Sequence, residues 1–324
     1  MKLIGRDREI DDIMDHILVW SSGLHIGDGP VGNFLLAGPS GSGKTKTIEY
    51  LAHRIHGAPR NFVKIDCGEF QLEHEVAKLI GAPPGYLGHR ETTPLITQQK
   101  LNAVTSERQN LSIVLFDEIE KAAPSMQRLL LGVLDKGTLR LGDNTMVNFE
   151  RSVIFFTSNL GTKDLFKNNA YEIAPTKREN VKDSTVDAAL RKHFAVEFLN
   201  RISKVFIYQA LTEDEARQVV RAELEAMGAK WRQIHGSFSC EFDESLVQPI
   251  FERGFSKEFG GRELKRTIHR LVTVPLARHV RDEWKGRTLG NLRIQLSWNG
   301  ALEIEVLEDN FMAAANAGGR KAKR

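Results

Sequence analysis

The sequence predicts an α/β fold in which helices flank a parallel sheet, followed by a smaller, mainly helical α+β domain. Two observations support this prediction. First, four short, almost wholly apolar runs alternate with helical stretches, at residues 34–37, 62–65, 113–116 and 153–156. Such runs are typical of parallel strands whose two faces are both covered. Second, residues 292–296 and 302–306 alternate apolar with polar side chains around an Asn299-Gly300 pair, which predicts a late hairpin.

The elements of the first domain follow in order along the chain. The opening helix is predicted from apolar residues that fall on one face at helical spacing, namely Ile10, Ile13, Met14, Ile17 and Leu18. A glycine-rich segment at 23–32 ends this helix. A further helix is predicted over 47–55, a hairpin within 138–147, and a last strand at 205–208. The polar segment 163–183 is predicted to be a surface excursion.

A domain boundary is predicted near Leu211, because Thr212 can cap a new helix with Glu215 at the third helical position. The elements that follow read helix, strand, helix, helix, strand, strand. We therefore assign residues 1–210 to a large domain and 211–309 to a small one. Residues 310–324, rich in Ala, Gly, Lys and Arg, form a basic tail that we expect to be disordered.

Charge and composition argue against several classes of protein. The chain of 324 residues has 45 Lys and Arg against 42 Asp and Glu, a net charge of +3, which is far from the basic balance of a dedicated nucleic-acid coat. No uncharged apolar run approaches the roughly 18 residues of a membrane helix, and the N-terminus lacks the apolar core of a signal peptide. Cys67 and Cys240 make no disulfide framework and are predicted to be buried or idle thiols in a reducing cytoplasm. We expect a cytoplasmic protein with no membrane partner.

Residues 38–45 match the phosphate-binding P-loop pattern in full, between a predicted strand and a predicted helix. The residues expected to bind nucleotide are Gly38, Pro39, Ser40, Gly41, Ser42, Gly43, Lys44 and Thr45. Glycines let backbone N–H groups turn toward a phosphate at the positive end of the helix dipole. Lys44 would supply a charge to the β- and γ-phosphates, and the Thr45 hydroxyl would bind Mg²⁺. The pattern predicts ATP and Mg²⁺ as cofactors.

Polar residues end two more of the predicted core strands. Asp117 and Glu118 follow the run at 113–116, and Asn159 follows the run at 153–156. Ligands of open α/β sheets bind at the carboxyl ends of the strands. We therefore expect Asp117 to hold Mg²⁺ through water, Glu118 to act as general base on the attacking water, and Asn159 to position that water. Without the P-loop, Asp117 and Glu118 would read as solvated acids at a strand end, and Asn159 as a turn residue that caps the next helix.

Five segments together resemble a known family. They are residues 81–88, 117–122, 157–161, 197–202 and 260–266, which read GAPPGYLG, DEIEKA, TSNLG, EFLNRI and GGRELKR. With the P-loop, they are similar to the AAA+ ATPases of the Clp type, and most of all to the second ATPase module of the ClpB disaggregase family. The resemblance covers roughly residues 4–308. It implies a P-loop AAA+ domain followed by the small C-terminal domain of that family.

The resemblance assigns roles to further residues. It implies that Arg201 is an arginine finger that reaches the γ-phosphate bound by a neighbouring subunit. It also implies that Arg262 is a second sensor, which touches the nucleotide of its own subunit. Ile4 and Gly5 would pack against the adenine. Without the resemblance, Arg201 would be a surface ion pair and Arg262 part of a solvated basic face.

The resemblance also places Tyr86 and Leu87 on a central pore loop that grips an extended polypeptide. An aromatic suits such a grip because it offers a large apolar area with few rotatable bonds; the alternative is a tyrosine packed in a Pro-Gly turn. Residues 88–93 read GHRETT, where the family usually has an acidic, glycine-rich stretch. Residues 163–181 lack the apolar-Gly-apolar docking loop of members that feed a protease, which argues against a peptidase partner.

These inferences predict an ATP-hydrolysing, ring-forming protein remodeller of the unfoldase or disaggregase kind, a homo-hexamer that threads polypeptide through a central pore. Because the sequence starts almost at the ATPase module, we expect substrate to arrive directly at the pore or through an adaptor protein. Two alternatives stay open. One is a motor or loader acting on nucleic acid, which the isoelectric point near 8.8 and the basic tail favour. The other is an ATP-timed assembly switch for a specialised complex.

Overall fold

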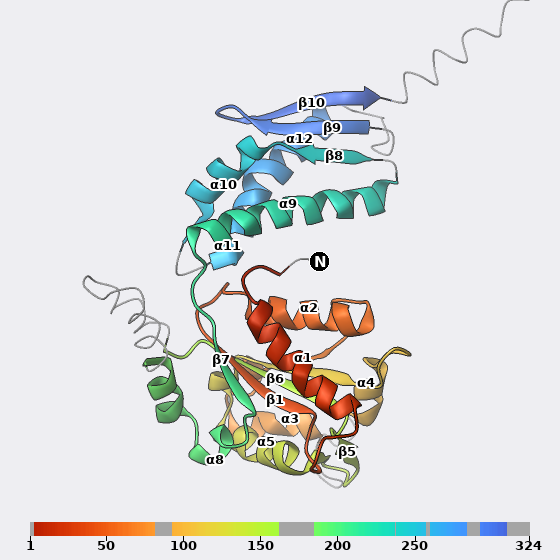
Figure 1. Ribbon diagram of the computed structural model, residues 1–324, viewed down its shortest axis with the longest axis vertical. Helices are drawn as coiled ribbons and strands as arrows, with labels where there is room; N and C mark the ends of the chain where they lie inside the picture. Colours follow the sequence, from red (N-terminus) through yellow and green to blue (C-terminus); the bar gives the residue numbers. More distant parts are fainter. Residues whose placement is uncertain are drawn as a thin grey trace, which may run out of the picture. The chain divides into compact units, whose positions relative to one another are not determined.

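The computed structural model describes residues 3–81, 93–161, 185–236, 238–256, 260–283 and 292–309. Contacts between residues divide the chain into two compact units, Leu3–Gln209 and Ala210–Arg324. The first unit is a sheet enclosed by helices, and the second combines helices with a smaller sheet (Figure 1). Within the described ranges, no helix has both the length and the apolar character needed to cross a lipid bilayer.

Five parallel strands form the sheet of the first unit, in the order β2-β3-β6-β1-β7. Their bounds are Gly32–Ala37 (β1), Val63–Asp66 (β2), Ser112–Asp117 (β3), Ser152–Ser158 (β6) and Lys204–Ile207 (β7). The order puts β6 between β3 and β1, and β1 between β6 and β7. The parallel sheet predicted from the apolar runs is confirmed.

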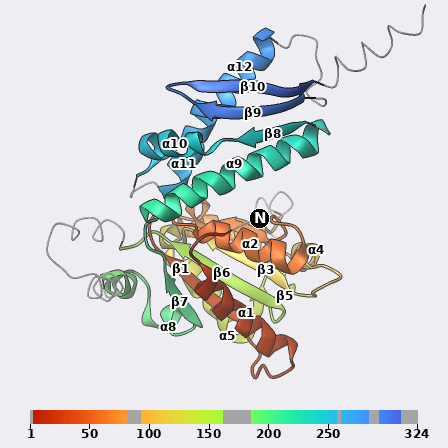
Figure 2. The same ribbon diagram turned by 45° about the horizontal axis from the view of Figure 1, so that its top comes forward.

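Both faces of this sheet are buried. Phe34 of β1 joins one core cluster and its neighbour Leu35 joins the other, because successive strand residues point to opposite faces. Helices α1 (Asp7–Ser21) and α2 (Lys44–His56) cover the face that holds Phe34 (Figure 2). The predicted apolar face of α1 is correct except for Leu18, which is 62% exposed. Only the stripe of Ile10, Ile13 and Ile17 is buried on this helix.

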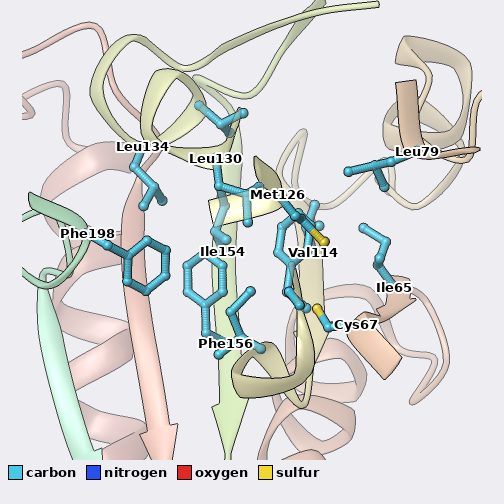
Figure 3. Close-up of a cluster of buried hydrophobic side chains, with 14 of the residues drawn as sticks. Ile65, Cys67, Leu79, Val114, Met126, Leu130, Leu134, Ile154, Phe156 and Phe198 are labelled. Carbon is cyan, nitrogen blue, oxygen red and sulfur yellow. The ribbon is translucent and has the colours of Figure 1, made fainter. Parts of the chain in front are cut away.

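The second core cluster lies under α5 (Pro124–Lys136) and α8 (Val196–Leu199). Figure 3 shows Phe156 of β6 near the middle of this cluster, with Phe198 beside it. The Phe156 ring stacks on Phe116 with centroids 5.3 Å apart and meets Phe198 edge-on at 5.2 Å. These aromatic contacts join β6 to β3 and to α8.

The other elements of the first unit are short. They are the helices α3 (Val76–Ile80) and α4 (Gln98–Ala103), three single 3₁₀ turns at Cys67–Glu69, Glu73–Glu75 and Ile119–Lys121, helical residues 185–193, and the strands β4 (Thr138–Arg140) and β5 (Met146–Asn148). Strands β4 and β5 pair antiparallel, so the predicted hairpin is confirmed. Helix α2 begins earlier than predicted, directly after the left-handed Gly43, which puts Lys44 and Thr45 in its first turn.

The second unit packs its helices around a separate core and a three-stranded sheet of order β10-β9-β8. Its elements are α9 (Glu213–His235), β8 (Ser239–Phe242), a 3₁₀ turn (Glu244–Leu246), α10 (Val247–Gly254), α11 (Gly260–Ile268), a π turn (His269–Thr273), α12 (Val274–Glu283), β9 (Leu292–Trp298) and β10 (Leu302–Asp309). The predicted hairpin of β9 and β10 is confirmed.

Two local predictions for the second unit can be compared with its structure. Thr212 caps α9 as predicted, since its Oγ1 accepts from the Glu215 N–H at 3.2 Å and Glu215 Oε2 accepts from the Thr212 N–H at 2.8 Å. The second of the two adjacent predicted helices is divided into α11 and α12 by the π turn. Pro275 lies just beyond that turn and has no N–H to donate, so regular α-helical bonding cannot continue through it.

The two cysteines are free and buried, as predicted. Burial raises the pKa of the Cys240 thiol to about 12 and raises that of Cys67 as well. Both thiols are therefore protonated at neutral pH and are part of the packing.

Replacing Phe156 tests the aromatic core of the first unit. We expect Phe156→Ala to lower the free energy of unfolding by about 3–5 kcal/mol, because it removes the ring that Phe116 and Phe198 contact. Phe156→Leu keeps most of the volume and should cost about 1.5 kcal/mol or less. Hydrogen exchange of the slowest amides in β1, β3 and β6 measures both. Equal losses for the two variants would contradict this role of the ring.

Candidate functional site

The carboxyl ends of three neighbouring strands bring the predicted site residues to one edge of the sheet. The P-loop follows β1, Asp117 ends β3, and Asn159 follows β6. All three strands are parallel and adjacent, so these residues meet at the same edge. Tyr208, which follows β7, flanks the P-loop on its other side.

Backbone shape sets the form of the P-loop. Gly38 has φ 151°, and a β-carbon there would lie 2.2 Å from the carbonyl oxygen of Tyr208, so no larger residue fits. Gly43 has φ 100°, in the left-handed region that favours glycine. A β-carbon on Gly43 would meet no atom within 4 Å, so the space beside it is open. The loop is thus fixed against β7 on one side and open where α2 begins.

Lys44 is the central cation of the site and is only 8% exposed. Its Nζ donates to the carbonyl oxygens of Gly38 at 2.6 Å and Pro39 at 2.9 Å, and to Oδ1 of Asn159 at 3.0 Å. The ammonium group is therefore held inside the loop and tied to the end of β6. Nearby, the Ser42 hydroxyl oxygen is buried and has no hydrogen-bond partner among the described residues.

Asp117 is held as a carboxylate by two neighbours. Thr157 Oγ1 donates to its Oδ1 at 2.5 Å, and Lys64 Nζ lies 2.6 Å from its Oδ2. Burial by itself would raise the pKa of Asp117, but the hydrogen bonds from Lys64 and Thr157 and the charges of Lys64 and Lys44 outweigh it. The net effect is a pKa below the usual value, so Asp117 is charged at neutral pH and suited to bind a cation.

Glu118 adopts a left-handed backbone conformation, with φ 58° and ψ 49°, which is uncommon for a residue other than glycine. Its N–H donates to Thr157 Oγ1 at 2.9 Å, which supports this conformation. Its carboxylate accepts from Asn159 Nδ2 at 3.4 Å and forms an ion pair with Lys121. The hydrogen bond with Glu118 raises the pKa of Lys121.

Asn159 therefore connects the two charged groups of the site. Its Oδ1 accepts from Lys44 and its Nδ2 donates to Glu118, while its own N–H donates to Glu120 Oε1 at 3.0 Å. Lysine and backbone N–H groups can bind a polyphosphate, and a carboxylate beside them can accept a proton from water. Within the described ranges, no three His, Cys, Asp or Glu side chains cluster to hold a metal. A divalent cation at Asp117 would need further oxygens, such as the Thr45 hydroxyl and those of a ligand or water.

Comparison with known proteins identifies the family. Residues 29–205 match the family model of the AAA domain (Cdc48 subfamily). The chain belongs to the AAA family. Residues 211–286 match the model of the C-terminal, D2-small domain, of ClpB protein. The resemblance to the second module of ClpB is thereby confirmed.

Relatives and solved structures agree with this family. The chaperone protein ClpB of Meiothermus ruber is 36% identical over 283 residues, 86% of this chain and 31% of that protein. ClpB of Mycoplasma genitalium is 31% identical over 312 residues, 96% of this chain and 39% of that protein. A closed-state structure of Hsp104 with ATPγS and FITC casein has a TM-score of 0.77 and 26% identity, and covers 94% of this chain and 49% of that chain. The extended S. cerevisiae Hsp104:casein complex has a TM-score of 0.74 at the same 26% identity, over 86% of this chain and 46% of that chain.

This AAA chain spans about a third of the length of those two curated relatives. Its remaining predicted site residues include Arg201, Arg262, Tyr86 and Leu87. Arg201 follows α8 and forms an ion pair with Asp135 of α5. Arg262 is an exposed residue of α11 in the second unit. Tyr86 and Leu87 lie outside the described residues, as does the segment 163–181.

A buried arginine of this AAA chain, Arg6, was not predicted as part of the site. The Arg6 side chain donates through Nη2 to the carbonyl oxygens of Ser42 at 3.2 Å and Gln209 at 3.1 Å, and its guanidinium lies 4.7 Å from the ring centre of Tyr208. Tyr208 in turn donates to Thr47 Oγ1 at 2.9 Å. Arg6 therefore fixes the segment that contains Ile4 and Gly5 against the P-loop. The sequence did offer one signal for Arg6, because it directly follows Ile4 and Gly5, the two residues expected to pack against the adenine.

Lys64 and Thr157, which hold Asp117, were missed because their partner is distant in sequence. Lys64 belongs to β2 and Thr157 to β6, the two strands on either side of β3. Only the strand order identifies them as neighbours of Asp117. Lys121, which pairs with Glu118, was also missed, although it lies only three residues further along the chain.

The Thr157 hydroxyl joins both carboxylate residues and can be removed without changing the shape of the side chain. We expect Thr157→Val to lower the free energy of unfolding of the first unit by about 1–3 kcal/mol, because Asp117 and the Glu118 N–H both lose a partner. Thr157→Ser keeps the hydroxyl and serves as the control. Hydrogen exchange in β3 and β6 measures the difference. A Val variant as stable as the Ser variant would contradict this role of the hydroxyl.

Proposed function

We propose that this chain is an ATP-hydrolysing module of a ring-forming protein remodeller. The observation that carries the proposal is the continuous link from Lys44 through Asn159 to Glu118, beside a charged Asp117 and at a complete P-loop. A phosphate-binding cation, a metal-binding carboxylate and a candidate general base are thus adjacent. This is the set of groups that nucleotide hydrolysis requires.

The residues present fit Mg²⁺ and ATP. The open space beside Gly43 suits the close approach of a phosphate, and the buried Ser42 hydroxyl, which has no partner in the described part of the chain, suits a polar ligand. The P-loop and Lys44 would hold the phosphates, Thr45 and Asp117 would hold Mg²⁺, and the segment anchored by Arg6 would lie against the adenine. When bound, Mg²⁺ supplies neutralisation of the phosphate charge.

The chain's own residues then perform the proton transfer. Glu118 would accept the proton of the attacking water, and Asn159, which contacts both Glu118 and Lys44, would orient that water between them. Lys121 forms an ion pair with the carboxylate of Glu118, next to the position proposed for the water.

The relatives support the larger assignment. ClpB is named a chaperone, and the two Hsp104 structures contain casein. We propose that this chain likewise acts on polypeptide, in the cytoplasm and as a homo-hexamer, in which Arg201 reaches a neighbour's nucleotide and Arg262 touches its own. Its large domain would be residues 1–210 and its small domain 211–309, with Tyr86 and Leu87 on the pore loop. An adaptor protein would fit this assignment.

Removing the general base tests the catalytic part of the proposal. We expect Glu118→Gln to bind ATP but to hydrolyse it at least about 100-fold more slowly, because an amide cannot accept the proton. The control is Glu73→Gln, which removes a surface glutamate that pairs with Arg128 at 3.8 Å and should leave the rate unchanged. Steady-state phosphate release and equilibrium binding of ATP are the measurements. Rapid turnover by the Glu118→Gln variant would exclude Glu118 as the base.

Added macromolecules distinguish remodelling of polypeptide from action on nucleic acid. We expect an unfolded polypeptide to raise the ATPase rate at protein concentrations that allow assembly, and Tyr86→Ala to abolish that rise while keeping the basal rate. DNA should have no effect. Stimulation by DNA that is indifferent to Tyr86 would instead favour a nucleic-acid motor. Stimulation by neither would favour the ATP-timed switch.

A further inference from the structure

Two groups of its own chain hold the side chain of Arg201. Its Nε lies 2.6 Å from Oδ1 of Asp135, and its Nη1 donates to the carbonyl oxygen of Glu197 at 2.7 Å. Its backbone carbonyl accepts from Asn33 Nδ2, at 3.2 Å, from β1. The residue is thus fixed at its backbone by the sheet and at its guanidinium by α5 and α8.

Asp135 is itself placed by rigid structure. It lies in the last turn of α5, whose Leu130 and Leu134 are buried against the sheet (Figure 3). The helix ends at Gly137, which has φ 61° and where a β-carbon would lie 2.7 Å from the carbonyl oxygen of Asp28. The backbone of Asp135 is therefore held in place, so its carboxylate can orient Arg201.

One edge of the Arg201 guanidinium has no partner among the described residues. Among the described residues, no group accepts a hydrogen bond from Nη2, and the side chain is 29% exposed. Its two partners, Asp135 and Glu197, are not part of the Lys44 cluster. A charged guanidinium with two of its nitrogens paired and the third without a partner in the described part of the chain is suited to bind an anion from outside the chain.

We infer that Asp135 is a positioning residue for Arg201, which sets the guanidinium in the orientation that a neighbouring copy's nucleotide requires. This inference rests on the proposed function, in which Arg201 acts on the next subunit. Exposed ion pairs contribute little to stability, so the contact matters through orientation. The contact lowers the pKa of Asp135 and raises that of Arg201, so both stay charged across the neutral range.

The expected effect is on the rate and not on binding. In this scheme Arg201 acts on negative charge that develops at the neighbour's γ-phosphate during hydrolysis, so Asp135→Asn should leave the KM for ATP almost unchanged. It should lower kcat by about 3- to 10-fold, the cost of ordering one flexible side chain during each turnover. Asp135→Glu keeps the charge and should lose less. Asp187→Asn is the matched control, because Asp187 pairs with Arg191 Nε at 2.7 Å on the surface of the same unit.

Mixed rings separate a positioning role from a structural one. Chains with Glu118→Gln cannot hydrolyse ATP at their own site but still present Arg201 to a neighbour. Chains with Arg201→Ala keep every other residue of their own site but present no arginine to a neighbour. Hydrolysis in the mixture therefore comes from sites where a Glu118→Gln chain supplies its arginine to an Arg201→Ala neighbour. Asp135→Asn is then placed on one chain or on the other, and steady-state hydrolysis is measured at a fixed mixing ratio.

We expect Asp135→Asn to lower hydrolysis by about 3- to 10-fold on the chain that supplies Arg201, and to have no effect on the chain that lacks it. Asp187→Asn should have no effect on either chain. An equal loss on both chains, or no loss on either, would overturn the inference while leaving the proposed function intact. A mixture no more active than its components would show that Arg201 does not act on a neighbour, and would overturn both.

Discussion

The amide of Asn159 is the interaction on which the rest of the site depends. It accepts from Lys44 on one side and donates to Glu118 on the other, so it joins the P-loop to the carboxylates of β3. It can do so because β6 lies between β1 and β3, with all three strands parallel. A different strand order would separate Lys44, which we propose to bind phosphate, from the candidate base. The order of the sheet is therefore the condition for the chemistry.

The same region stores backbone strain that its neighbours hold in place. A left-handed conformation at a residue with a side chain, such as Glu118, costs about 1–3 kcal/mol and persists only where the surroundings fix it. Here Thr157 accepts from the Glu118 N–H and donates to Asp117, so one buried hydroxyl orients two consecutive carboxylate residues. Because of this conformation, the strand ends at Asp117, the proposed metal-binding residue, and does not continue through Glu118, the proposed base.

The parts of this site that local pattern determines could be predicted from sequence, and the parts that depend on tertiary pairing could not. The P-loop, Asp117 and Asn159 follow apolar runs directly, so their place at the carboxyl edge follows from strand direction alone. Lys64 lies mid-strand in β2 and contacts Asp117 only because β2 and β3 pair in a register that sets Asp66 opposite Asp117. The same holds for Asp135, whose partner Arg201 is distant in sequence and follows another helix.

Each charged group of the site already has a polar or charged partner within the chain, and these partners determine the effect of a single substitution. Lys44 contacts Asn159 and two carbonyl oxygens, Lys64 pairs with Asp117, and Lys121 pairs with Glu118. A bound polyphosphate therefore exchanges existing partners and does not meet isolated charges. Removing Lys64 or Lys121 leaves a largely buried carboxylate without its cation, a penalty that adds to the loss of the pair itself. The effects of single substitutions here include this penalty, so they are not additive, and only paired substitutions isolate each contact.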